Sequence, residues 1–175
     1  MIPRKIREAL HHILHLDETP HVLAKSLAVG VFVAFTPFMG LHTVLVLILA
    51  WALRLNKAVA LTGTFVNNPW TIAFIFVGPT WATVAAMRSM GVDMPPFNYD
   101  VVTGHFMNAM EQYKIWQPVF WKTFLMEFKP YLHAFLIGTA LAGLAAAFVS
   151  YGVSFLGIHY YRMEKAKLKK KKAEV

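Results

Sequence analysis

Cysteine is absent from this 175-residue sequence, and charged residues are scarce, since Asp, Glu, Lys and Arg together make up 15%. Without cysteine the chain has no disulfide, no thiolate nucleophile and no cysteine-ligated metal. Catalytic signatures are missing too, because there is no Gly-x-Ser-x-Gly, no phosphate-binding loop and no His-Glu-x-x-His. The sequence therefore favours a protein that is not an enzyme, and we predict no catalytic residue, no cofactor and no metal site.

The sequence contains three long hydrophobic runs without charged residues. Hydrophobic residues make up 57% of the chain, and residues 26–53, 58–87 and 130–161 contain no Asp, Glu, Lys or Arg. Soluble proteins carry about 25% charged residues, and about 20 apolar residues are enough to cross a bilayer as a helix. We therefore predict an all-α integral membrane protein that forms one domain over residues 1–175.

The two ends of the chain contain most of the basic residues. Residues 1–19 have the spacing of an amphipathic helix, with Ile6 and Leu10 on its apolar face, and we expect it to lie on the membrane surface. Residues 131–158 form the predicted C-terminal transmembrane helix, and the tail, residues 159–175, carries seven Lys or Arg against two Glu. Beside a membrane segment such a cluster is a cytoplasmic signal, so we predict contact with anionic lipid and not with nucleic acid.

Prolines interrupt the hydrophobic runs. Residues 21–53 are cut at Thr36-Pro37 into pieces of about 15 and 14 residues, each about 22 Å long as a helix and too short for a core about 30 Å thick. We predict a broken helix or a re-entrant hairpin there, with both ends on the cytoplasmic side. Residues 58–87 form a second, broken transmembrane segment, interrupted at Asn67-Asn68-Pro69 and again at Gly78-Pro79.

Residues 88–130 are polar and aromatic, and we expect an extramembrane or interfacial segment with a loop at Pro95-Pro96 followed by helices. An interfacial aromatic belt is predicted from Tyr113, Trp116, Trp121 and Tyr131. In the last hydrophobic run, small residues recur every four positions and predict close helix packing against the broken segments or a second subunit. These small residues are Ala134, Gly138, Ala142, Ala146, Ser150 and Ser154.

The two main breaks resemble each other in sequence. GVFVAFTPF begins at Gly30 and GTFVNNPW at Gly63, and both contain a polar residue, a proline and then an aromatic residue. Thr36 and Asn68 are good N-cap residues before a proline, so each break would start a half-helix. Converging helix N-termini attract anions, and paired interruptions mark binding sites in transporter-like folds. The predicted ligand-binding residues are Thr36, Pro37, Gly40, His42, Arg54, Asn56, Asn67, Asn68, Pro69 and Thr71.

Simpler roles exist for the same residues. The prolines can merely kink helices, with Asn67, Asn68 and Thr71 paired to one another for packing. Arg54, at a helix end, can be an anchor at the membrane surface instead of a clamp for an anionic headgroup. His42 can be a hydrogen-bonded packing residue instead of a functional one.

Three motifs occur in a fixed order: TPFMGLHT, then LRLN, then NNPWT, preceded by the small residues of 24–30. Over about residues 20–160 the chain resembles the bacterial family catalogued as domain of unknown function 2062. The resemblance implies a small inner-membrane protein of a family that is sometimes joined to glycosyltransferase domains and has no established activity. The matching positions are Pro37, Gly40, Arg54, Asn56, Asn68, Pro69 and Thr71.

These observations lead to one main functional hypothesis. We expect a multi-pass protein of the bacterial inner membrane, with both termini in the cytoplasm, that binds or translocates an anionic amphiphile with a phospholipid or polyprenyl-phosphate headgroup. The alternative is a non-transporting membrane scaffold that partners a separate cell-envelope glycosyltransferase. An enzyme that uses His42 or the N-terminal histidines is the third hypothesis. Expected partners are membrane lipids, such an enzyme, or a second copy of the chain.

Overall fold

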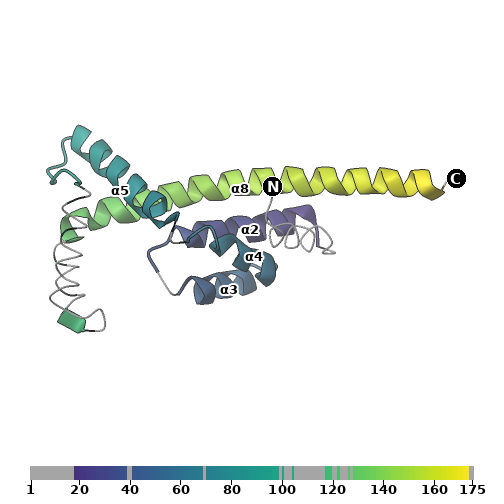
Figure 1. Cartoon of the computed structure of the whole chain (residues 1–175), viewed down its shortest axis with the longest axis horizontal. Helices are drawn as coiled ribbons and strands as arrows, with labels where there is room; N and C mark the ends of the chain where they lie inside the picture. Colours follow the sequence, from purple (N-terminus) through teal and green to yellow (C-terminus); the bar gives the residue numbers. More distant parts are fainter. Residues whose placement is uncertain are drawn as a thin grey trace. The chain divides into compact units, whose positions relative to one another are not determined.

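A computed structural model of the chain describes residues 18–38, 41–68, 70–98, 100, 104, 117–119, 122, 126 and 128–173. The predicted N-terminal helix and most of the predicted aromatic belt lie outside this part of the chain, as do Gly40 and Pro69. All regular structure in the described residues is helical, with no strand among them, so the predicted all-α class is confirmed there (Figure 1).

The chain divides into two compact units. Met1–Val66 and Gly143–Val175 form the first, and Asn67–Ala142 form the second. The long helix α8 (Leu132–Ala173) contributes its first part to the second unit and the remainder to the first.

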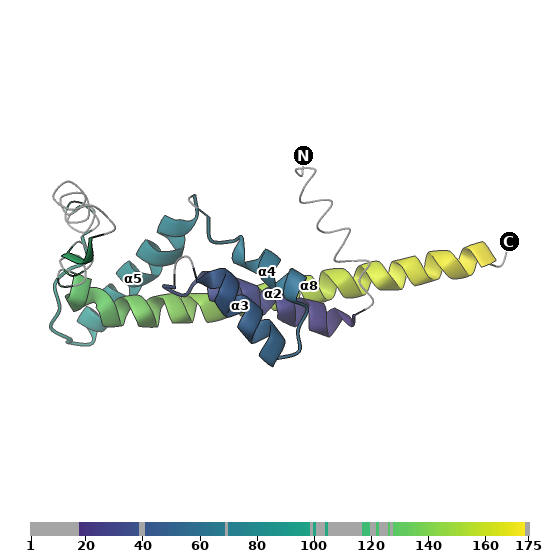
Figure 2. The ribbon, with the colours of Figure 1, turned by 90° about the horizontal axis from the view of Figure 1, so that it is seen from below.

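Three short helices form the body of the first unit: α2 (Pro20–Ala34), α3 (His42–Ala52) and α4 (Lys57–Thr64) (Figures 1 and 2). The helical break predicted at Thr36-Pro37 is confirmed, because α2 ends before it and α3 begins beyond it. Thr19 caps α2, since its hydroxyl accepts a hydrogen bond from the backbone N–H of Val22 at 3.4 Å. The helices enclose a core of Val33, Val46, Ala50 and Ala60.

The two glycines of the internal repeat meet where α2 packs against α4. A Cβ atom added to Gly30 would lie 2.9 Å from the Cα of Gly63, and one added to Gly63 would lie 2.8 Å from the Cα of Gly30. Such distances are shorter than any real Cβ contact, so only glycine allows the two backbones to come this close. Ser26 and Ala34, one turn to either side of Gly30, are fully buried as well. The repeat therefore encodes a close helix–helix contact.

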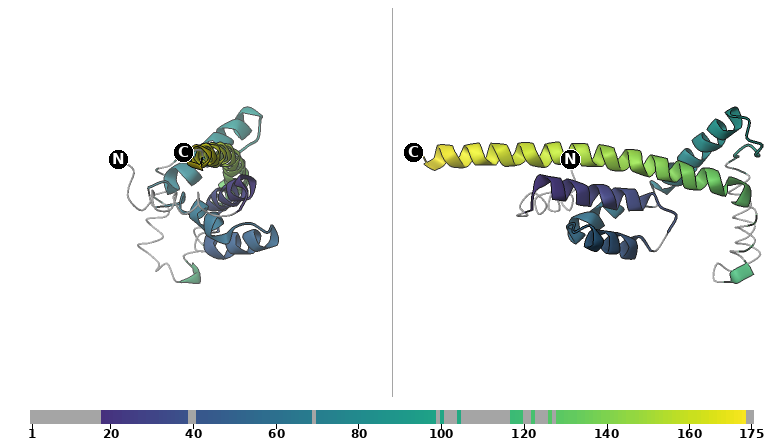
Figure 3. Two further views of the ribbon diagram at one scale, coloured as in Figure 1. Left: turned by 90° about the vertical axis from the view of Figure 1, so that its right-hand side faces the viewer. Right: turned by 180° about the vertical axis from the view of Figure 1, so that it is seen from behind.

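Within the first unit, α8 runs antiparallel to α2 (Figure 3). A Cβ atom on Gly143 would meet Phe35 just past the end of α2, while Ile158 packs with Leu23 near its start. Further along, a guanidinium nitrogen of Arg162 donates to the backbone carbonyl of Glu18 at 2.7 Å. The beginning of α2 and the base of the basic tail therefore lie side by side.

The second unit contains α5 (Ile72–Ser89), the 3-10 turn η1 (Lys129–Tyr131) and the first residues of α8. The packing predicted for the small-residue face is confirmed at Gly138, where a Cβ atom would lie 2.5 Å from the carbonyl oxygen of Pro79. Pro79 itself does not break the segment, contrary to the second interruption predicted there, because α5 continues through it.

Tyr131 also departs from the sequence prediction. It is only 9% exposed, and its hydroxyl donates to the backbone carbonyl of Pro96 at 3.3 Å. Its ring packs edge-on against Phe97 at a centroid distance of 5.3 Å. Tyr131 therefore secures the predicted Pro95-Pro96 loop to α8 and is a core residue, not a member of an interfacial belt.

One helix among the described residues is long and apolar enough to cross a membrane, judged by length and composition. It covers Lys129–Leu168, and 22% of its most apolar window is buried. α2 and α3 are apolar but have 15 and 11 residues, too few to cross alone.

Candidate functional site

The interhelix turn at Thr36 differs from the half-helix start predicted there. The Thr36 hydroxyl donates to the carbonyl of Val33 at 2.7 Å, so it closes α2 and does not cap α3. α3 begins at His42, after Leu41, which makes no side-chain cap. His42 turns its Nε2 atom back to the carbonyl of Thr36 at 2.9 Å and must donate, because a carbonyl only accepts. This hydrogen bond agrees with the packing role considered for His42, while the functional role stays a prediction. Pro37 is half-buried in the same turn.

The second break is confirmed, but the helix does not start directly after Asn68 as predicted, because α5 begins at Ile72 with Thr71 as its N-cap. The side-chain oxygen of Asn68 accepts from the backbone N–H groups of Trp70 at 2.9 Å and Thr71 at 3.1 Å, which closes the turn before α5. The Thr71 hydroxyl also accepts from the backbone N–H of Asn68 at 3.1 Å. Asn68 and Thr71 are thus paired with each other, while Asn67 beside them is half-buried. Because Thr36 and His42 belong to the other unit, the predicted convergence of two helix starts stays a prediction.

Arg54 closes α3 in an unusual backbone conformation. Its φ angle is +54°, the left-handed region, which costs a residue with a side chain roughly 1–2 kcal/mol. The backbone N–H of Arg54 donates to Trp51 O at 3.2 Å, and that of Leu55 donates to Ala50 O at 2.8 Å. These two bonds form a Schellman motif, in which the left-handed position is usually glycine.

Asn56 starts α4 and joins three parts of the first unit. Its side-chain oxygen accepts from the backbone N–H of Val59 at 2.9 Å, and its amide nitrogen donates to Glu18 Oε1 at 3.0 Å. The backbone N–H of Asn56 donates to the buried hydroxyl of Ser26 at 2.9 Å, which itself donates to the carbonyl of Val22. The other carboxylate oxygen of Glu18 is buried and accepts no hydrogen bond from the described residues. Every role seen for Asn56 is therefore structural.

Sequence reasoning missed Glu18 and Ser26. Glu18 lies within residues 1–19, the segment predicted as a surface helix, and Ser26 is a single polar residue at the edge of an apolar run. One signal was available for Ser26, because it lies four residues before Gly30 and so shares its helix face. No sequence signal pairs Glu18 with Asn56, 38 positions away.

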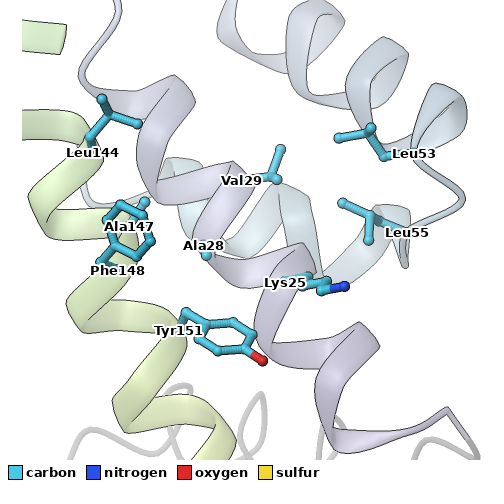
Figure 4. Close-up of a pocket in the computed structure, with 9 residues that line it drawn as sticks. All are labelled: Lys25, Ala28, Val29, Leu53, Leu55, Leu144, Ala147, Phe148 and Tyr151. Carbon is cyan, nitrogen blue, oxygen red and sulfur yellow. The ribbon is translucent and has the colours of Figure 1, made fainter.

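An apolar groove runs over α2 in the first unit (Figure 4). α8 forms one wall and the α3–α4 turn forms the other, and the cavity volume is about 470 Å³. Its apolar lining residues are Ala28, Val29, Leu53, Leu55, Leu144, Ala147 and Phe148. Two polar side chains also line it, Lys25 from α2 and Tyr151 from α8. The Tyr151 hydroxyl lies 2.7 Å from Nδ1 of His21, so it is held in place.

A second hollow lies next to the groove, on the α3–α4 turn. Its volume is about 580 Å³, and it shares Leu55 with the groove. Arg54 and Lys57 supply two cations there, and Trp51 supplies an indole ring. In the part of the chain that the structure describes, neither these two cations nor Lys25 forms an ion pair. No set of three metal-ligating side chains occurs among the described residues either.

In the residues that the structure describes, the protein is helical, has one helix long and apolar enough to cross a membrane, and has an apolar groove lined by a lysine. The chain belongs to the family described as "Uncharacterized protein conserved in bacteria (DUF2062)", which matches residues 3–167. The predicted family is thereby confirmed over a longer stretch than the motifs alone cover. No curated protein and no solved structure matches the chain.

Proposed function

We propose that this protein is a multi-pass protein of the bacterial inner membrane that binds an anionic lipid in the groove over α2. The observation that carries the proposal is an exposed lysine at the edge of a mostly apolar groove. Lys25 lines the groove together with seven apolar residues and Tyr151. A hydrocarbon chain fits such walls, and an ammonium group beside them suits a phosphate headgroup. We retain the anionic ligand predicted from the sequence. We propose that it binds in the groove over α2 and not at the helix breaks.

Membrane embedding is supported by large apolar side chains that face outward. On α3, Val44 and Trp51 are 54% and 71% exposed. Where α2 meets α4, glycines let the two backbones approach closely, at Gly30 and Gly63. Outward-facing apolar side chains and small residues at close helix contacts are typical of helices packed in lipid, where apolar exposure carries no penalty. Similar exposed side chains follow one another along α8: Phe148, Val149, Val153 and Leu156.

The position of the cations supports the cytoplasmic orientation. Lys25 and Leu53 line one groove, so the first half of α2 and the end of α3 lie together, as expected for a hairpin. Arg162, at the base of the basic tail, contacts the start of α2 through Glu18. By the positive-inside tendency this end of the unit faces the cytoplasm, and the α2–α3 turn points into the bilayer. Bound lipid would then have its headgroup near the inner surface.

Native mass spectrometry of the purified full-length protein tests the proposal. We expect the wild type to retain anionic phospholipid or polyprenyl phosphate and Lys25→Met to retain about tenfold less, because a charge-assisted contact contributes about 1.5–3 kcal/mol. Ala147→Trp, which fills the groove, should have the same effect. Lys122→Met is the matched control, because it removes one exposed lysine that lies outside the first unit and its basic tail.

Equal lipid retention by the wild type and Lys25→Met would refute the groove as the binding site. Unchanged lipid retention combined with loss of cellular function on deleting residues 169–172 would favour the alternative, a non-transporting scaffold for a cell-envelope glycosyltransferase. Scrambling of fluorescent lipid in reconstituted vesicles distinguishes translocation from binding alone, since only translocation exposes lipid of the inner leaflet to an external quencher.

A further inference from the structure

We infer that the groove and the neighbouring hollow form one bipartite site, and that its ligand is a single-chain lipid diphosphate. This inference rests on the proposed function and specifies its ligand. The two cavities share Leu55, which belongs to the short connection between α3 and α4. A ligand whose chain lies in the groove therefore has its polar end next to the hollow that contains Arg54 and Lys57.

The backbone of Arg54 indicates that its side chain has a purpose beyond closing α3. The Schellman turn requires a left-handed residue, and glycine meets that requirement without steric cost. Arginine is present instead, at a φ of +54° and with an exposed side chain. Arg54 is one of the residues that line the hollow, and a guanidinium group can bind two phosphate oxygens at once. Strain of this kind at a cavity is a feature of functional sites.

Charge complementarity determines the headgroup. Lys25 lines the groove, and Arg54 and Lys57 line the hollow, so three cations surround the combined site. None of the three forms an ion pair with another described residue, and the nearby Glu18 is bonded to Asn56 instead. A phosphodiester carries one negative charge and would leave most of this positive charge unneutralised. A diphosphate carries two or three, with one phosphate placed for Lys25 and the other for the Arg54–Lys57 pair.

The size of the groove determines the number of chains. Its volume of about 470 Å³ lies toward the lower end of the range for small-molecule sites, and one face of it is formed by a single helix, α2. One hydrocarbon chain fits this space, whereas a lipid with four chains does not. The site therefore suits an isoprenoid-type diphosphate and not a bisphosphatidyl lipid.

Binding measurements on the full-length protein in neutral detergent test the inference, with farnesyl diphosphate and farnesyl monophosphate as probes. We expect the wild type to bind the diphosphate at least about tenfold more tightly, the ratio that corresponds to one additional charged contact. Arg54→Gly keeps the left-handed turn and should abolish this preference, because it weakens diphosphate binding more than monophosphate binding. Lys57→Gln should reduce the preference as well, and Arg88→Gln, on an exposed residue of the other unit, should preserve it.

Thermal unfolding provides the folding control, because Arg54→Gly should melt at or above the wild-type temperature. Arg54→Asn is a second variant that tolerates the left-handed conformation and tests the same contact. Equal affinity of the wild type for both probes would overturn the diphosphate inference but leave Lys25-dependent lipid binding intact. Tighter binding of cardiolipin than of farnesyl diphosphate, or equal binding of inorganic diphosphate, would overturn the single-chain ligand. Binding of both probes that is unaffected by Lys25→Met would instead refute the proposed function.

Discussion

Replacing Asn56 by aspartate removes one hydrogen bond and leaves another intact. The side-chain oxygen of Asn56 accepts from the backbone N–H of Val59 at 2.9 Å, and an aspartate oxygen can do the same. The amide nitrogen donates to Glu18 Oε1 at 3.0 Å, and aspartate has no donor to replace it. Asn56→Asp therefore places two carboxylates against each other while keeping the cap of α4.

The expected destabilisation follows from these contacts. A hydrogen bond to a charged group contributes about 1.5–3 kcal/mol, and two like charges in contact add repulsion, so we expect a total loss of about 2–4 kcal/mol. For a chain of this length 1 kcal/mol lowers the melting temperature by about 2–4 °C. The Asn56→Asp variant should therefore melt about 5–15 °C below the wild type.

A double-mutant cycle with Glu18→Gln tests the cause. In the double variant the glutamine amide can donate to the introduced aspartate, so the bond is restored with its direction reversed, and most of the melting temperature should return. The assay is intrinsic tryptophan fluorescence during heating in one detergent, for the wild type, both single variants and the double variant. Additivity of the two single effects within about 0.3–0.5 kcal/mol would refute the reasoning, since it would mean that the two side chains do not interact.

Two further predictions concern the packing and the orientation of the first unit. Gly30→Ala and Gly63→Ala should each lower the melting temperature more than the control Gly78→Ala, because a Cβ atom at the first two would overlap backbone, whereas at Gly78 it would meet no atom within 4 Å. Equal effects at all three glycines would contradict the close α2–α4 contact. Lys57→Cys, the single thiol in a cysteine-free chain, should react with a membrane-impermeant maleimide in inside-out vesicles and not in intact spheroplasts. Labelling only in spheroplasts would reverse the proposed orientation.

Local signals located the break at Asn67-Asn68-Pro69 but not the first residue of the helix beyond it. The Asn68 side chain closes the turn, because an N-cap side chain bonds to backbone groups only two or three residues away, whereas α5 itself begins at Ile72. The same rule failed at Thr36. Its hydroxyl instead bonds to the preceding turn of α2, at Val33 O. Threonine can bond in either direction along the chain, and the surrounding packing decides which bond forms.

The sequence by itself determined the family, the all-helical composition, the charge-free runs and the repeated glycines, because these depend on residue types and short spacings. Only the tertiary structure showed that the repeated glycines form a close helix–helix contact, since Gly30 and Gly63 come together only where α2 packs against α4. Tertiary structure also decided which polar side chains line the same groove. Lys25 and Tyr151 are 126 positions apart and line one groove only because α8 folds back along α2. Long-range contacts of this kind leave no local pattern, because packing between distant segments selects them.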